Sequence, residues 1–214
     1  MFSELHRRVD WGHITAMSLL LLVLSASPSA GQDQWRQTVQ TIVPVKEKTI
    51  ARALLDSVVS VVQNQDIPVQ QAPQASSTSF KAIEDTLSEE GLAASSATHM
   101  FITYRFSLSS STFNEKILDL YYIFRPEGQG GEDIPILYLD LREGRLYESL
   151  LIERGTRLTS NEATFLPFKQ QVGFNDLRDQ LAVVRVGNRT IRDTARAAAE
   201  KKRILEVIRN LTYN

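Results

Sequence analysis

The sequence contains no cysteine among its 214 residues. This absence excludes disulfide bonds, thiolate zinc sites and cysteine nucleophiles. An exported protein without cysteine is held together by core packing alone. That is more typical of bacterial envelope proteins than of small secreted domains that depend on disulfides.

Histidine is scarce as well, with three in the chain: His6, His13 and His99. If an N-terminal signal is removed, His99 alone remains, which excludes a histidine-rich metal site. The chain contains neither a G-x-S-x-G nucleophile motif nor a D-x-D-x-D-G calcium loop. Acidic residues flank the glycines of residues 128–131 and would repel phosphate. We therefore expect no metal and no cofactor, and the residue inventory favours a non-enzymatic role.

Charge is nearly balanced, with 24 basic and 25 acidic residues and a net charge of −1. Nonspecific nucleic-acid binding requires a large basic excess, so we expect no nucleic-acid partner. Basic residues gather near the C-terminal end, at Arg192, Arg196, Lys201, Lys202 and Arg203. A solvated helix face explains them, and the functional alternative is a docking surface for an acidic partner or anionic headgroups.

The most apolar run, residues 16–25, is only about ten residues long. A membrane-spanning helix needs about 20, so we expect no transmembrane span. Arg7 and Arg8 precede the run, and small residues follow it up to Gly31. This order predicts a signal peptide over residues 1–31 and a periplasmic or secreted location, with a buried core helix as the alternative.

Helical spacing of apolar residues predicts an N-terminal helical segment over residues 32–64, with Pro44 starting or kinking its main helix. Residues 65–79 are rich in proline, glutamine and serine, which predicts a flexible linker. An α+β domain is expected over residues 80–214. It begins with a short helix over residues 80–90 and ends with a helix over residues 193–211.

Between these helices, apolar and other residues alternate from His99 to Leu108, which predicts a strand with one apolar face. Further strands are expected over residues 116–125, 134–141, 146–153, 164–172 and 181–186, with a tight hairpin at residues 142–145. The short turns imply antiparallel pairing. The predicted fold class is α+β: a curved antiparallel meander sheet of about five to six strands, packed with N-terminal and C-terminal helices.

Side chains on the predicted strands supply two candidate sites. Aromatic residues could line a groove for a small apolar or lipid-like ligand, although core packing explains them as well; they are Tyr104, Phe106, Tyr121, Tyr122, Phe124, Tyr138 and Tyr147. Asp119 and Asp140 could face one side of the sheet as a carboxylate pair. Charged residues on the solvent face of an antiparallel sheet would look the same.

Three functional hypotheses follow from these patterns. The favoured one is an exported, non-enzymatic envelope protein, acting as an adaptor, assembly factor or binding module whose partner is another envelope protein. The second is a carrier of a small apolar or lipid-like ligand. The third is a hydrolase that works through carboxylates.

Overall fold

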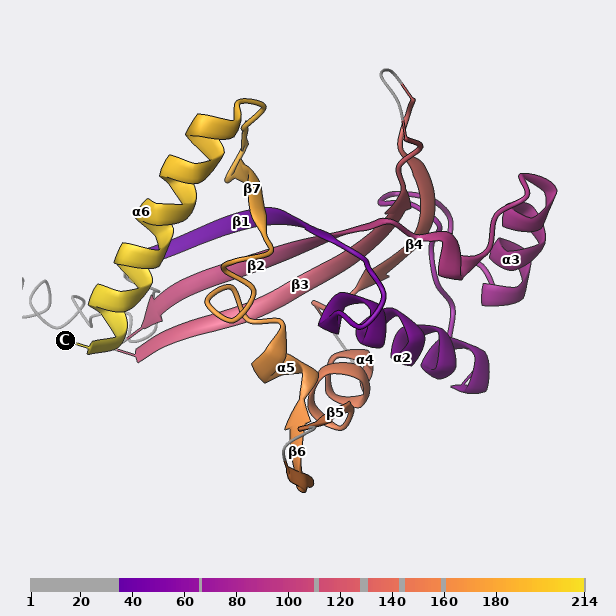
Figure 1. The fold of residues 1–214 in the computed structure, drawn as a ribbon, viewed down its shortest axis with the longest axis horizontal. Helices are drawn as coiled ribbons and strands as arrows, with labels where there is room; N and C mark the ends of the chain where they lie inside the picture. The colour runs from indigo at the N-terminus through magenta and orange to yellow at the C-terminus, as the bar shows by residue number, and fades with distance from the viewer. Residues whose placement is uncertain are drawn as a thin grey trace, which may run out of the picture. The chain divides into compact units, whose positions relative to one another are not determined.

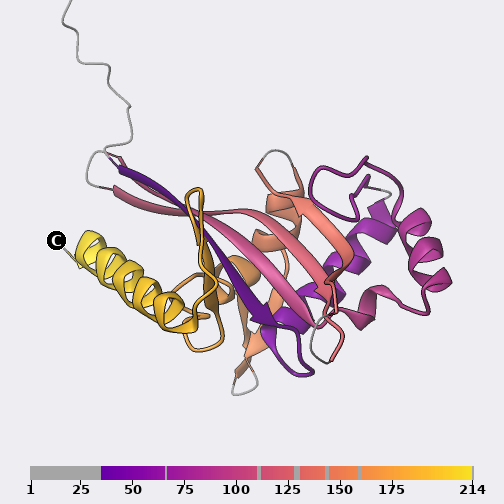
Figure 2. The ribbon, with the colours of Figure 1, turned by 90° about the horizontal axis from the view of Figure 1, so that it is seen from above.

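A six-stranded antiparallel sheet, in the order β4-β3-β2-β1-β7-β8, dominates the fold (Figure 1). The computed structural model describes residues 35–65, 67–109, 112–127, 131–142, 145–158 and 161–213, so the predicted signal peptide lies outside the described residues. β5 and β6 pair separately as a two-stranded sheet. The long strands twist along their length, as the right-handed preference of extended L-residues requires (Figure 2).

The bounds of the elements are as follows. The strands are β1 (Trp35–Pro44), β2 (His99–Ser109), β3 (Thr112–Phe124), β4 (Ile134–Asp140), β5 (Gly155–Leu158), β6 (Asn161–Pro167), β7 (Ala182–Val186) and β8 (Arg189–Thr190). The α-helices are α2 (Ile50–Gln65), α3 (Phe80–Glu89), α4 (Arg145–Tyr147), α5 (Phe168–Gln171) and α6 (Thr194–Tyr213). A 3₁₀ turn covers Ala94–Ser96, and a π-helical turn covers Glu148–Ile152. The predicted α+β class with an antiparallel sheet is confirmed, and the sheet is open.

One face of the sheet forms the hydrophobic core. Alternate residues of β2, from Met100 to Phe106, are fully buried there. α2 packs onto the core through a stripe at helical spacing: Ala51, Leu54, Leu55, Val58, Val61 and Val62. The predicted period-two pattern of β2 and the helical stripe of α2 are both confirmed.

The helix predicted over Trp35–Val43 is wrong, because this segment is strand β1. Thr38, Val39 and the run from Thr41 to Val43 are β-branched, which favours extended backbone over helix. β1 also pairs with β2 along its whole length, from Trp35 opposite Leu108 to Pro44 opposite His99. Pro44 ends the strand and does not start the helix.

The strand predicted over residues 146–153 is also wrong, and so is the hairpin at residues 142–145. Residues 145–152 form α4 and the π-helical turn. Leu150 and Leu151 are both fully buried. Successive strand residues point to opposite faces, so a strand at the surface would expose one of the two leucines, whereas a helical turn buries both.

The remaining segments are partly as expected. β6 ends at Pro167 and α5 follows it, so the strand predicted over residues 164–172 is about half helix. β7 and α6 confirm the last predicted strand and helix. Residues 65–79, predicted as a flexible linker, hold the buried Val69 and pair with the edge of β4 through Gln70 and Tyr138, with N···O distances of 3.4 and 2.7 Å.

Candidate functional site

The face of the sheet opposite the core carries a row of polar side chains that crosses all six strands. Each member of the row is the register partner of the next: Thr190, Arg185, Gln40, Thr103, Asp119 and Asp140. Side chains alternate between faces along a strand, and partners in register lie side by side. Each strand therefore contributes one polar residue to a continuous band.

A second row lies two residues further along the strands and is mainly aromatic. Its successive register partners are Ile42, Phe101, Tyr121 and Tyr138, of which the last three carry rings. The rings of Phe101 and Tyr121 stack with centroids 5.8 Å apart, and those of Tyr121 and Tyr138 meet edge to face at 6.2 Å. Both distances are typical of favourable aromatic pairs, so the rings form an ordered platform.

The polar row and the three aromatic residues of the second row form the floor of a groove with a volume of about 880 Å³. The groove is bounded on the side of β4 by Gln70, Pro73 and Gln74, and on the other side by Gly187 and Thr190 of the β7–β8 hairpin. Its size lies within the range of cavities that hold ligands, about 300–1,000 Å³. The groove is therefore a binding-site candidate assembled from segments far apart in the sequence.

Arg142 links the two carboxylates at one end of the polar row. Its guanidinium lies 3.7 Å from Asp119 and 3.8 Å from Asp140, and its backbone N–H donates to Asp140 Oδ1 at 2.9 Å. Further along, Thr103 hydrogen-bonds to Asp119, and the amide of Gln40 donates to Thr103 Oγ1 at 3.3 Å. This chain of contacts orders the floor of the groove across four strands.

Burial is the main cause of the shifted pKa values of Asp119 and Tyr138 in the groove. Burial raises the pKa of Asp119, while Thr103 and Arg142 act in the opposite direction. Burial and the nearby carboxylates raise the pKa of Tyr138 to about 12, so its hydroxyl is neutral at physiological pH. The Asp119 side chain is only 8% exposed, whereas that of Asp140 is 50% exposed. Asp140 is thus placed to contact a ligand, and Asp119 supports the floor.

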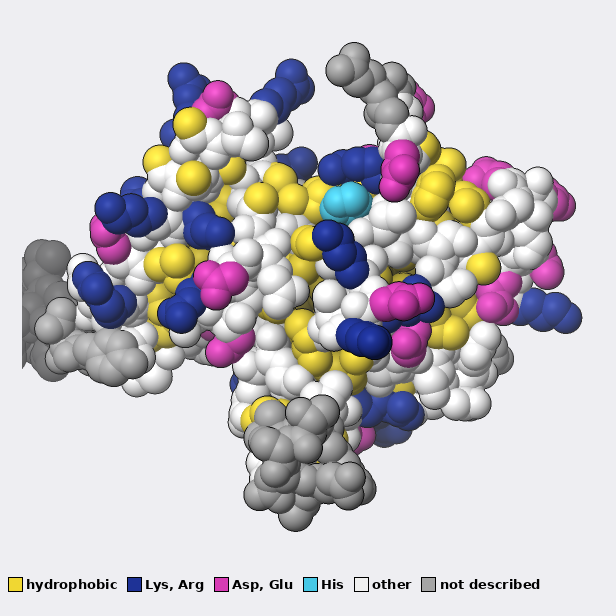
Figure 3. Space-filling model, viewed as in Figure 1, with side chains coloured by type: hydrophobic (Ala, Val, Ile, Leu, Met, Phe, Trp, Pro, Cys, Tyr) yellow, Lys and Arg dark blue, Asp and Glu magenta, His cyan; other side chains and the backbone are white. Residues whose placement is uncertain are grey.

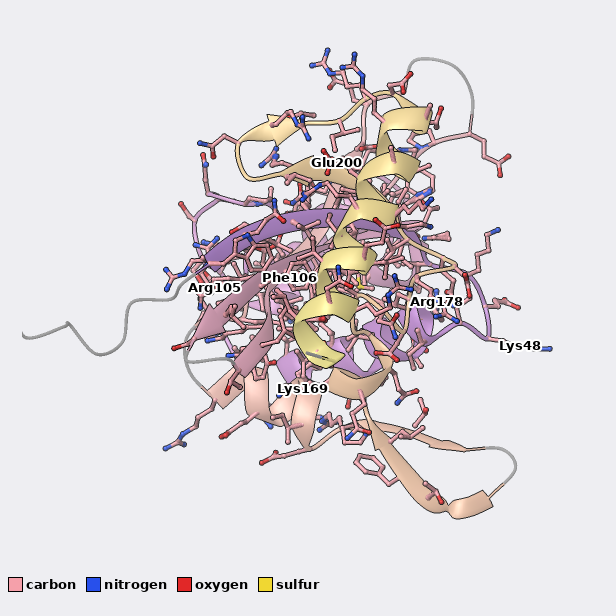
Figure 4. All side chains as sticks on the ribbon, turned by 90° about the vertical axis from the view of Figure 1, so that its left-hand side faces the viewer. Lys48, Arg105, Phe106, Lys169, Arg178 and Glu200 are labelled. Carbon is pink, nitrogen blue, oxygen red and sulfur yellow. The ribbon has the colours of Figure 1, made fainter. Side chains whose placement is uncertain are left out.

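The aromatic candidates from the sequence divide between the two faces of the sheet. Tyr121 and Tyr138 line the groove, but Tyr104, Phe106 and Tyr122 are fully buried in the core. Figure 4 shows the neighbours Arg105 and Phe106 on opposite sides of β2. Tyr104 and Phe106 pack edge to face on Phe174, with centroids 5.6 and 5.5 Å apart, and Phe124 is half-buried against the core. These four residues form core packing, so they do not support the predicted ligand groove.

The basic candidates all lie on α6 or directly before it, away from the groove. Lys201 Nζ donates to the carbonyls of Arg178 and Leu181 at 2.7 and 3.2 Å. Arg203 donates to Glu200 at 2.7 Å. Arg203 is nevertheless exposed, as are the other three candidates, Arg192, Arg196 and Lys202. Lys201 therefore holds the helix against the preceding loop, and the four exposed candidates are the ones that can meet a partner.

Several groove residues were not singled out from the sequence, among them Gln40, Phe101 and Arg142. Phe101 and Thr103 did appear on the face opposite the apolar residues of β2, which was the one available signal. The carboxylate pair was anticipated, since Asp119 and Asp140 do share a face as register partners. The rows themselves depend on strand order and register, which no single segment encodes.

Within the described parts of the chain, no group of three or more histidine, cysteine, aspartate or glutamate side chains is placed to hold a metal ion. Among the same residues, no helix combines the length and apolar character needed to cross a bilayer. Comparison with known protein families and with curated proteins found no match to this chain.

Proposed function

We propose that this chain is an exported, non-enzymatic binding protein that holds an extended segment of a partner protein in the sheet groove. The observation that carries the proposal is the aromatic row beside the polar row on one concave face. Tyrosine and arginine on such a surface are the residue types that dominate affinity at protein interfaces. The groove offers Tyr121, Tyr138, Arg142 and Arg185 together.

The dimensions of the rows suit a peptide that crosses the strands. Six strands spaced about 4.8 Å apart span about 24 Å, which is the length of about seven extended residues. Carboxylate, hydroxyl and amide groups of the polar row can hydrogen-bond to the peptide backbone, and the aromatic row can receive alternate apolar side chains. An extended peptide presents backbone N–H and C=O groups along its edges and every second side chain on each face.

Export is part of the proposal and rests on the leader. Two arginines, about ten apolar residues and a stretch of small residues stand in the order that secretory signals use. N-terminal sequencing of the natural protein should find a terminus near residue 32. Recovery of the folded chain from the cytosol with Met1 intact would contradict the export proposal.

Hydrolysis is the second candidate, favoured by one observation. Asp119 and Asp140 are register partners, one buried and one exposed, at the end of the groove. The Arg142 guanidinium lies close to both carboxylates, and Thr103 hydrogen-bonds to Asp119. Because both contacts engage the Asp119 carboxylate, it is not open to a substrate. Binding without catalysis fits this geometry better. A hydrolytic activity that disappears in Asp140→Asn would favour the enzyme instead.

A photo-crosslinking amino acid placed at Tyr121 tests the binding proposal in the cells that make the protein. We expect a product with one partner whose crosslinks map to a single short segment. The double variant Asp140→Lys, Arg185→Glu should remove this product, and the same crosslinker at Asp56, an exposed position on α2, should not form it. No product at Tyr121, or the same product at Asp56, would overturn the proposal.

A further inference from the structure

A second groove runs beside α6 and shares no residue with the sheet groove. Its volume is about 700 Å³. Apolar side chains form its floor: Phe113, Ala198, Leu205 and Ile208. Charged side chains form its rim: Arg178, Lys201, Lys202, Glu206 and Arg209. In Figure 3, apolar side chains are visible between Lys and Arg side chains over α6, at the left of the molecule.

α6 is held along one side and leaves the other side open. Of the α6 residues whose burial the structure describes, only Ile204 is buried, while Leu205 and Ile208 are half-buried. The Lys201 hydrogen bonds to the carbonyls of Arg178 and Leu181 fix the helix against the loop that forms the far wall. The groove is therefore already formed without a ligand, which lowers the entropic cost of binding.

The rim carries four cations and the single carboxylate Glu206, and two of the cations, Lys202 and Arg209, are unpaired among the described residues. No carboxylate of the described residues lies within ion-pair distance of Lys202 or Arg209. Arg178 has only the exposed neighbour Asp179 at 3.8 Å, and Figure 4 shows Arg178 beside the helix. Apolar residues between unpaired cations are complementary to a partner that is apolar on one face and acidic at its edges.

We propose that the α6 groove receives an acidic amphipathic helix of a partner protein. Its residues extend from Ala198 to Thr212, a helical length of about 21 Å, so the partner helix needs about four turns. Apolar residues at i, i+3, i+4 and i+7 would enter the floor, and Asp or Glu beside them would meet Lys202 and Arg209. A lipid surface is the poorer fit, because membrane-binding helices project their apolar side chains outward.

Two designed helical peptides with the same apolar stripe provide the probe, one flanked by glutamate and the other by lysine. Fluorescence anisotropy measures their binding to the purified protein at low and moderate salt. We expect the glutamate peptide to bind more tightly, and the variant Lys202→Glu, Arg209→Glu to weaken it roughly tenfold and to reverse the preference. The control variant Arg192→Glu, Arg196→Glu changes two exposed arginines outside this groove and should alter binding less than twofold.

Equal binding of the two peptides, or loss of binding in the control variant to the same extent, would overturn the proposal. Co-sedimentation with vesicles that contain about a third anionic lipid distinguishes the membrane alternative. Vesicle binding that depends on Lys202 and Arg209, without discrimination between the peptides, would assign the surface to lipid instead.

Urea unfolding of each variant shows whether it is folded, and a second pair, Leu205→Ser and Ile208→Ser, tests the floor independently of charge.

Discussion

Replacing Glu115 with glutamine should stabilise the protein at neutral and alkaline pH. Glu115 lies on β3 at the margin of the core, where its Oε1 accepts the Phe174 N–H at 2.9 Å. Burial is the main cause that raises its pKa to about 7, and Asp176 adds to the rise while Lys169 opposes it. A carboxyl group with this pKa is better accommodated in the fold when it is protonated.

The size of the effect follows from the difference between folded and unfolded pKa. A pKa that rises from 4.5 in the unfolded chain to about 7 in the folded protein changes the free energy of unfolding by about 3 kcal/mol, at about 1.4 kcal/mol per pH unit. Because the folded state binds the proton more tightly, this contribution to the free energy of unfolding is fully present below pH 4.5 and is lost as the pH rises through 7. Glutamine retains the acceptor for Phe174 and carries no charge. Its advantage over glutamate should therefore grow between pH 4.5 and 8 to at most about 3 kcal/mol.

Urea unfolding of both proteins at several values between about pH 4.5 and about pH 9 measures the difference directly. The difference curve should rise and then level off above about pH 8. Glu89→Gln, which removes an exposed carboxylate from α3, serves as the control and should show no comparable rise. A difference that is constant with pH, or a Glu115→Gln variant that is less stable at pH 8, would refute the reasoning.

Three further changes test the packing. Tyr104→Phe should cost about 1–3 kcal/mol in urea unfolding, because the Tyr104 hydroxyl donates to the Val172 carbonyl at 2.9 Å and that acceptor would lose its partner. Tyr122→Phe should cost nothing or stabilise, since this buried hydroxyl has no partner among the described residues; a loss equal to that of Tyr104→Phe would contradict this. Gly155→Ala would place a Cβ in steric conflict with the Leu166 carbonyl oxygen. It should lower the melting temperature and open the β5–β6 pair to proteolysis, and unchanged protease resistance would argue against the contact.

Much of the fold was predictable from local pattern. The alternation from Met100 to Phe106 placed β2 correctly, because a half-buried strand needs apolar residues at every second position. The spacing of Leu54, Val58 and Val62 likewise predicted α2. The pattern failed at β1, where β-branched residues and full-length pairing with β2 outweighed the adjacent helical signal. It also failed at Leu150 and Leu151, because two adjacent apolar residues do not distinguish a strand from a helical turn.

The sequence by itself determined the α+β class, the antiparallel pairing, the absence of cysteine chemistry and the basic character of the C-terminal helix. Only the tertiary structure decided which aromatic residues form the core and which form the groove, with Phe106 inside and Tyr121 on the open face. Periodicity gives each strand two faces but does not say which strands are neighbours. The rows of the groove exist because hydrogen bonding between strands distant in the chain brings Gln40, Thr103 and Asp119 into register.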